Sequence, residues 1–322
     1  MMIRQTAISL VILSMLLSVL TSCRHKDILC PGNEPHTLTV KFMWDKAPEA
    51  APDGMTLYFF PAGEGTRIWR FDIAGREGGN VEIPQGEYRF LAVNNDLPGV
   101  MFSGEDAYGN FTANTRKNQE TGLMRPTGML YGGTVDHVEV TPCGIIYTTP
   151  EGTMKECRQG LLRCHPDSLS CVYNVIFRRC EGVENIRTAS ACLQGEASAL
   201  RVAYDTPGGE PVATAFPLES IRLTDGDALT GCTTVLGIDT EHAPSVTLTL
   251  NVERTDGKHI AKSFDVTDQV VNSMNPHNVF IIITGVEIPA GDTPDTPGGD
   301  VGIDVGVDGW QTIEIDLGTT LP

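Results

Sequence analysis

Strict alternation of apolar and polar residues constrains the fold of this chain more than any other feature of its sequence. In the stretch 36–44, apolar side chains occupy every second position; they are those of Leu38, Val40, Phe42 and Trp44. Successive side chains of a β-strand point to opposite faces of the sheet, so a period of two predicts a strand with one buried face.

The same period recurs along most of the chain, and helical spacing is sparse. We predict further strands at 55–60, 66–73, 81–83, 88–94, 100–102, 109–112, 130–141, 171–179, 200–204, 213–218, 246–252, 260–266 and 279–286. Hairpin turns are expected at Pro84-Gln85-Gly86 and Thr255-Asp256-Gly257-Lys258. One short helix is expected over 185–194, ended by Gly195, and the β-branched run 279–286 is expected to be a central strand. The fold class is therefore all-β, with two β-sandwiches in tandem.

Proline, glycine and cysteine residues in the stretch 142–165 mark the crossing between two predicted domains. The N-terminal sandwich is placed at 36–150 and the C-terminal sandwich at 151–322, and each is long enough to bury its own core. Within the second, the segment 289–299 consists almost entirely of Pro, Gly, Asp and Thr, which predicts a flexible linker. A last strand with Ile313, Ile315 and Leu317 on one face follows. It either completes its own domain or is donated to another subunit.

Residues 1–22 are predicted to be a lipoprotein signal peptide. Arg4 gives the segment a positively charged N-terminal region, and the run 7–20 is apolar. This run is too short for a membrane span, which needs about 20 apolar residues. The run ends in Leu20-Thr21-Ser22-Cys23, with small residues directly before a cysteine, as cleavage and thioether lipidation require. Cys23 is therefore the predicted lipidation site, and 23–35 is a polar tether. An ordinary secretory peptide with a chance cysteine is the alternative.

The formal net charge of −18 argues against two classes of partner. Phosphate backbones and anionic lipid surfaces would be repelled, so nucleic acid is not an expected partner. The charge is spread along the chain, as expected of a protein that stays soluble at a crowded cell surface.

Eight cysteines remain once Cys23 carries lipid: Cys30, Cys143, Cys157, Cys164, Cys171, Cys180, Cys192 and Cys232. In an exported protein this even number allows disulfides, and at least one is expected in the second domain, although the sequence does not select a pairing. The six residues that separate Cys157, Cys164 and Cys171 from one another exceed the spacing of zinc-binding motifs, so no metal site is expected.

No catalytic or cofactor-binding motif stands out, and the chain is not expected to be an enzyme. The histidines His137, His165, His242, His259 and His277 are scattered, with no carboxylate or cysteine at a functional spacing in the sequence, so surface or turn histidines are favoured over catalytic ones. Asp300, Asp304 and Asp308 recur at every fourth position. Calcium loops place ligands at every second position, so an ordinary acidic turn is favoured over a calcium site.

Five aromatic residues allow two interpretations. Trp44, Trp69, Trp310, Tyr58 and Tyr88 could form a platform on which a glycan stacks, or they could belong to the core. The alternation places Trp44 with Leu38 and Phe42, so the core interpretation is favoured, most clearly for Trp44 and Tyr88.

Several short motifs resemble those of a known family. They are Asp27-Ile28-Leu29-Cys30, Val40-Lys41-Phe42-Met43-Trp44, Gly54-Met55-Thr56-Leu57-Tyr58-Phe59-Phe60-Pro61, Pro84-Gln85-Gly86-Glu87-Tyr88-Arg89-Phe90-Leu91-Ala92-Val93-Asn94-Asn95, Phe264-Asp265-Val266-Thr267-Asp268-Gln269-Val270 and Val307-Asp308-Gly309-Trp310. Together with Cys23, they resemble the fimbrillin-like lipoproteins of anaerobic Gram-negative bacteria, in particular the fimbrial anchor and accessory branch.

This resemblance implies two transthyretin-like β-sandwiches in a protein anchored by lipid in the outer membrane. It implies a structural or adhesive role, fimbrial subunits as partners, and assembly through a strand added to an open sheet edge. No catalytic residue or cofactor comes with the family. The cysteines of the second domain depart from the family pattern. A surface glycan-binding lipoprotein that works beside a polysaccharide importer is the alternative, because it would share the same features.

Overall fold

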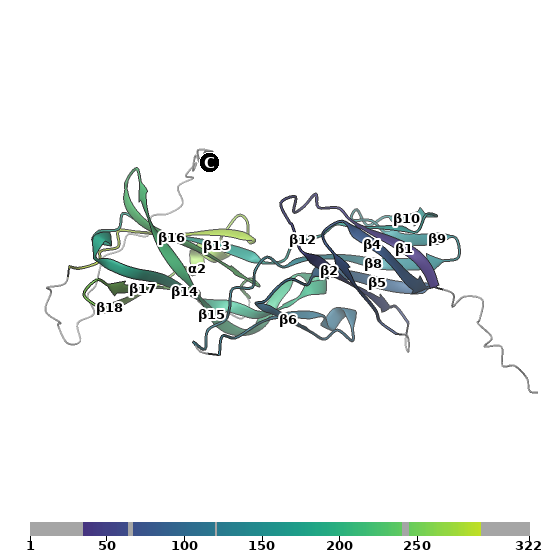
Figure 1. Cartoon of the computed structure of the whole chain (residues 1–322), viewed down its shortest axis with the longest axis horizontal. Coiled ribbons are helices and arrows are strands. Elements are labelled where there is room, and N and C mark those ends of the chain that lie inside the picture. Colours follow the sequence, from purple (N-terminus) through teal and green to yellow (C-terminus); the bar gives the residue numbers. More distant parts are fainter. Residues whose placement is uncertain (1–34, 64–66, 120, 240–244, 291–322) are drawn as a thin grey trace, which may run out of the picture.

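The computed structural model of the chain describes residues 35–63, 67–119, 121–239 and 245–290. Strands hold 61% of the residues and helices 6%, so the expected all-β fold class is confirmed. Within them, the helical elements are α2 (Thr267–Val271) and the 3-10 turns η1 (Tyr108–Asn110), η2 (Val183–Asn185) and η3 (Val202–Tyr204). Figure 1 shows two β-rich halves that follow one another along the long axis.

Several predicted features lie outside the described residues. They are the signal peptide 1–22, Cys23, Cys30, the rest of the tether up to residue 34, His242, and everything after residue 290, which includes Asp300, Asp304, Asp308, Trp310 and the last predicted strand.

The first half consists of two sheets that enclose a core. The smaller sheet has the order β11-β1-β4, with β1 parallel to β11 and antiparallel to β4. The larger sheet has the order β10-β9-β8-β5-β2-β3, with β12 paired to β8. Alternate side chains such as Val40 of β1 and Phe59 of β2 meet between them. The bounds are β1 (Pro35–Phe42), β2 (Gly54–Pro61), β3 (Trp69–Ala74), β4 (Gly78–Pro84), β5 (Gly86–Asn94), β8 (Tyr131–Thr141), β9 (Gly144–Thr148), β10 (Met154–Cys157), β11 (Leu161–Cys164) and β12 (Asp167–Ser168).

The second half is one series of paired strands that folds over into two layers. The order is β18-β17-β14-β15-β16-β13-β19. The long strand β15 pairs with β14 up to Leu218 and with β16 from Glu219 onward, so it passes from one layer to the other. A second core lies between the layers, with Leu248 of β17 and Ile281 of β19 among its members. The bounds are β13 (Cys171–Arg178), β14 (Ile186–Arg201), β15 (Thr206–Leu223), β16 (Gly226–Val235), β17 (Thr247–Arg254), β18 (His259–Asp265) and β19 (Asn278–Thr284).

A third cluster of buried side chains joins the two halves. Tyr58 packs against Phe111, and both share this cluster with Leu91 and with Leu200 and Leu236 of the second half. Both faces of β2 and β5 are therefore buried. The short strands β6 (Val100–Ser103) and β7 (Thr112–Thr115) lie in this region, and β7 pairs with β14. Figure 1 places β6 where the halves meet.

Two local predictions were wrong. The stretch 185–194 is not a helix: most of it lies in β14, which pairs with β15 on one side and β17 on the other. Pairing on both edges outweighs a weak local helical pattern. Pro84-Gln85-Gly86 is not a hairpin turn, because β4 pairs with β1 whereas β5 pairs with β2 and β8. The chain there crosses from one sheet to the other.

Two expectations about position also differ from the structure. Most of the run 279–286 lies in β19, which among the described strands pairs with β13 alone and so stands at the edge of the sheet rather than in its centre. The stretch after residue 150 does not open the second half, because β10 pairs with β9 and β11 pairs with β1. The change to the second sheet system comes between β12 and β13, later than the expected boundary between 150 and 151. The predicted hairpin turn at 255–258 is confirmed by the pairing of β17 with β18.

Candidate functional site

Two histidines have carboxylate partners that the spacing of the sequence does not indicate. His165 Nδ1 lies 2.8 Å from Asp45 Oδ1, and His277 Nε2 lies 3.6 Å from Asp205 Oδ2. On the other side of the His277 ring, Nδ1 lies 4.0 Å from Cys171 Sγ. The fold therefore forms a Cys-His-Asp row from residues far apart in the sequence, and no local pattern in the sequence indicates it.

The properties of Cys171 argue against a nucleophilic role for this row. The side chain is 7% exposed, and burial raises the pKa of its thiol to about 12. A cysteine nucleophile reacts as a thiolate and needs a lowered pKa. At neutral pH Cys171 is a protonated core thiol, so the row does not provide the chemistry of a cysteine hydrolase.

The described cysteines are all free thiols, and the strands keep many of them apart. Cys164 lies in the core of the first half, whereas Cys171 and Cys180 lie in the core of the second. Cys143 and Cys232 are exposed. The disulfide in the second domain stays a prediction, which peptide mapping without reductant can test. Within the described residues, no group of three or more His, Cys, Asp or Glu side chains gathers as a metal site would.

Three of the candidate platform aromatics are buried, which confirms the core interpretation for Trp44 and Tyr88. Trp44 Nε1 donates to the carbonyl of Arg76 at 2.7 Å, and the Tyr88 hydroxyl donates to the carbonyl of Pro84 at 3.0 Å. Tyr58 is also buried. Trp69 is half-buried beneath the Arg67 guanidinium, 4.9 Å from the ring centre. These side chains do not form an exposed face on which a glycan could stack.

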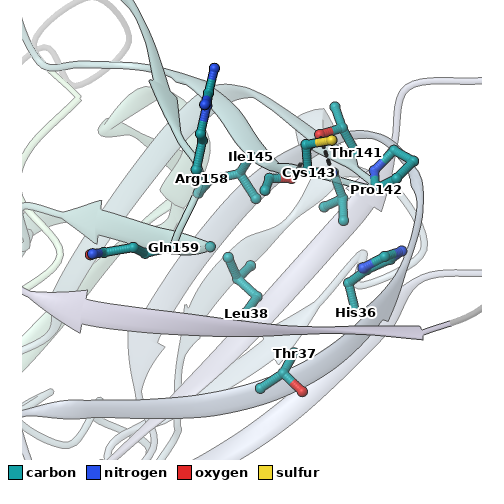
Figure 2. Close-up of a pocket in the computed structure, with 12 residues that line it drawn as sticks. His36, Thr37, Leu38, Thr141, Pro142, Cys143, Ile145, Arg158 and Gln159 are labelled. Carbon is teal, nitrogen blue, oxygen red and sulfur yellow. Dashed lines mark hydrogen bonds between the residues drawn. The ribbon is translucent and has the colours of Figure 1, made fainter.

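A small cavity lies between the start of β1 and the turn that joins β8 to β9 (Figure 2). Its volume is about 210 Å³, below the roughly 300–1,000 Å³ typical of small-molecule sites. Leu38, Cys143 and Arg158 are among its lining residues, and Figure 2 shows the Arg158 side chain extending away from Leu38. The cavity has neither the volume nor the converging polar groups of a ligand site.

The open strand edges of the first half are a better candidate for a binding surface than this cavity. Among the strands that the structure describes, β3 pairs only with β2, and β4 pairs only with β1. A Cβ placed on Gly79 of β4 would lie 3.2 Å from Ile73 Cδ1 of β3, so the two strands face each other across the core. The core-facing residues of β3, Trp69, Phe71 and Ile73, are only partly buried. A further strand added beside β3 and β4 would cover this apolar row.

The fold of the described residues defines an all-β protein with open sheet edges. None of the helices in the described part of the chain has the length and apolar character that crossing a bilayer requires. Residues 22–217 match a family model described as a domain of unknown function, DUF5119. This match spans more than half of the chain, and the chain belongs to the DUF5119 family.

The chain also resembles individual proteins along most of its length. A protein of Bacteroides ovatus named as a candidate fimbrium anchoring subunit, Fim4B, is 23% identical over 328 residues, which cover 94% of each chain. The resemblance to fimbrial anchor and accessory proteins predicted from the sequence motifs is thereby confirmed.

Two solved structures share the fold. A candidate adhesin of Bacteroides ovatus superposes with a TM-score of 0.57 at 18% identity, over 85% of this chain and 99% of that one. A candidate adhesin of Bacteroides thetaiotaomicron superposes with a TM-score of 0.52 at 12% identity, over 80% of this chain and 92% of that one.

Proposed function

We propose that this protein is a cell-surface fimbrial anchor or accessory subunit with a structural and adhesive role and no enzyme activity. The observation that carries the proposal is the similarity to a fimbrium anchoring subunit over 94% of both chains. The absence of an aromatic platform among the described aromatics Trp44, Tyr58 and Tyr88 makes the glycan-binding alternative the less supported one.

Anchoring through lipid on Cys23 is part of the proposal. What supports it is the signal sequence that ends in Leu20-Thr21-Ser22-Cys23. Because β1 begins at Pro35, the tether would join the membrane to the first half of the molecule. We also propose that both halves are transthyretin-like sandwiches and that the protein lies in the outer membrane.

Assembly by strand addition is the proposed mechanism. The support is the half-buried apolar row of β3 next to the open edges of β3 and β4. A strand from a fimbrial subunit would pair with an open edge through backbone hydrogen bonds and would cover Phe71 and Ile73 with its own apolar side chains.

The test of the anchoring role uses a strain that lacks the gene, complemented with wild type or with Cys23→Ala. We expect Cys23→Ala to leave the membrane fraction and the fimbriae to appear in the medium, as seen by electron microscopy. Membrane partitioning that does not change would contradict lipidation. Cells without the gene that keep a normal number of fimbriae would contradict the anchoring role.

The test of the strand-addition site uses Phe71→Lys, with Met154→Lys at an exposed position of β10 as the matched control. We expect Phe71→Lys to reach the surface in normal amounts but to bind fewer fimbriae, because a cation replaces the apolar contact. The control should behave as wild type. Equal fimbriation of both variants would contradict the site.

A further inference from the structure

The strand β19 has one side without a strand partner. It pairs in parallel with β13, and β13 pairs with β16 on its other side. Within the described ranges, no strand borders the second edge of β19. An open edge presents backbone N–H and C=O groups with which another strand can pair.

A side chain takes the place of a strand at one point of this edge. The backbone N–H of Ile282 donates to Gln269 Oε1 at 2.8 Å, and Gln269 Nε2 donates to the carbonyl of Ile282 at 3.1 Å. One residue of a neighbouring strand would make the same two bonds. Gln269 of α2 therefore takes up a single residue position along this edge, and α2 contacts β19 there.

Exposed apolar residues are concentrated in the chain that leads into β19. Met274, in the connection before β19, is 93% exposed, and Phe280 on β19 is 47% exposed. Val271 at the end of α2 is also exposed. Three of the seven large apolar residues exposed in the described part of the chain thus fall within 271–280. A concentration of this kind is typical of a surface that another segment covers.

We infer that the stretch 310–317 of the same molecule adds to β19 as a strand and displaces Gln269 from Ile282. Its odd positions, Ile313, Ile315 and Leu317, match the buried row of Val279, Ile281 and Ile283 in β19. The even positions of the stretch, Glu314 among them, then fall on the same face of the sheet as Phe280.

The length of the intervening chain fits this assignment. A Gly-rich chain of the length of 291–309 has an r.m.s. span of about 25 Å. A strand of the length of β19 extends roughly 23 Å, and the described chain ends at residue 290, shortly after β19. The tail therefore reaches the edge without a second molecule. This inference does not depend on the fimbrial role.

Hydrogen exchange of the mature full-length protein tests the proposal. Ile313→Asp with Ile315→Asp should make the β19 amides exchange about tenfold faster or more, because the edge loses its strand. The matched control is Val301→Asp with Ile303→Asp, which makes the same chemical change outside the proposed strand and should leave β19 exchange as in wild type.

The role of Gln269 gives a second readout. Gln269→Ala alone should not change the exchange of the Ile282 amide, because the tail strand already protects it. In the Ile313→Asp, Ile315→Asp background, the same substitution should accelerate that amide. Identical β19 exchange in wild type and the tail variant would overturn the proposal. So would a wild-type dimer, seen by sedimentation, that dissociates in the tail variant, since the strand would then come from a second copy.

Discussion

At the scale of single residues, Glu196 is an unusual member of the second half. The side chain is 1% exposed and lies on β14 next to the irregularity in strand register at Gly195. The Thr214 hydroxyl donates to Oε2 at 2.6 Å, whereas Oε1 has no hydrogen-bond partner among the described residues. Burial raises the pKa of this carboxyl to about 8.

This shift predicts how stability depends on pH. At pH values between 4.5, the ordinary pKa of a glutamate, and about 8, the folded chain keeps a proton on Glu196 that the unfolded chain has released. The free energy of unfolding therefore falls as the pH rises through that window. Glu196→Gln should remove this dependence and raise the free energy of unfolding near pH 8 by up to roughly 5 kcal/mol.

Urea denaturation at about pH 5 and about pH 8 measures the effect. Glu219→Gln, at an exposed position of β15, is the control and should follow wild type at both values. A Glu196→Gln protein that loses stability with pH as steeply as wild type would show that Glu196 is not the titrating group.

At the scale of elements, a glycine allows the tight turn that connects β17 to β18. Gly257 has φ +82°, and a Cβ added to it would meet no atom within 4 Å. The Gly257 N–H donates to the carbonyl of Arg254 at 3.0 Å. The turn therefore depends on backbone conformation rather than on side-chain space.

Gly257→Ala should lower the free energy of unfolding by about 1 kcal/mol, because an L-residue is strained at positive φ. Gly63→Ala is the matched control: its Cβ would also meet no atom within 4 Å, and its φ is not in the positive range. Thermal unfolding of the two variants provides the comparison. Equal losses would mean that strain at Gly257 is not the cause.

At the scale of the whole molecule, the third cluster couples the two halves. Phe111 is fully buried, with its ring 4.8 Å from the ring of Tyr58 and 5.3 Å from that of Phe102. Leu200 and Leu236 bring the second half into the same cluster. Loss of packing at Phe111 should therefore affect both halves.

Phe111→Ala should destabilise the protein by about 3–5 kcal/mol and accelerate hydrogen exchange in both β8 and β17. Val175→Ala, in the core of the second half, should accelerate exchange in β17 and not in β8. If Phe111→Ala accelerates exchange in one half alone, the halves are energetically independent.

Whole-molecule organisation was also the hardest feature to predict from the sequence. The Pro, Gly and Cys residues of 142–165 correctly indicated turns, but β9, β10 and β11 lie between those turns and belong to the first half. A turn residue indicates that the chain changes direction, but it does not indicate which sheet the next strand joins.

The sequence by itself determined the all-β class, the place of most strands, the turn at 255–258 and the burial of Trp44 and Tyr88, because each follows from the alternation of neighbouring side chains or from local turn chemistry. The tertiary structure alone decided that β4 pairs with β1, that 185–194 lies mostly in a strand, and that β19 is an edge among the described strands. It also brought Cys171, His277 and Asp205 together. Strand partners and such clusters depend on contacts between residues far apart in the chain, which a local period of two does not encode.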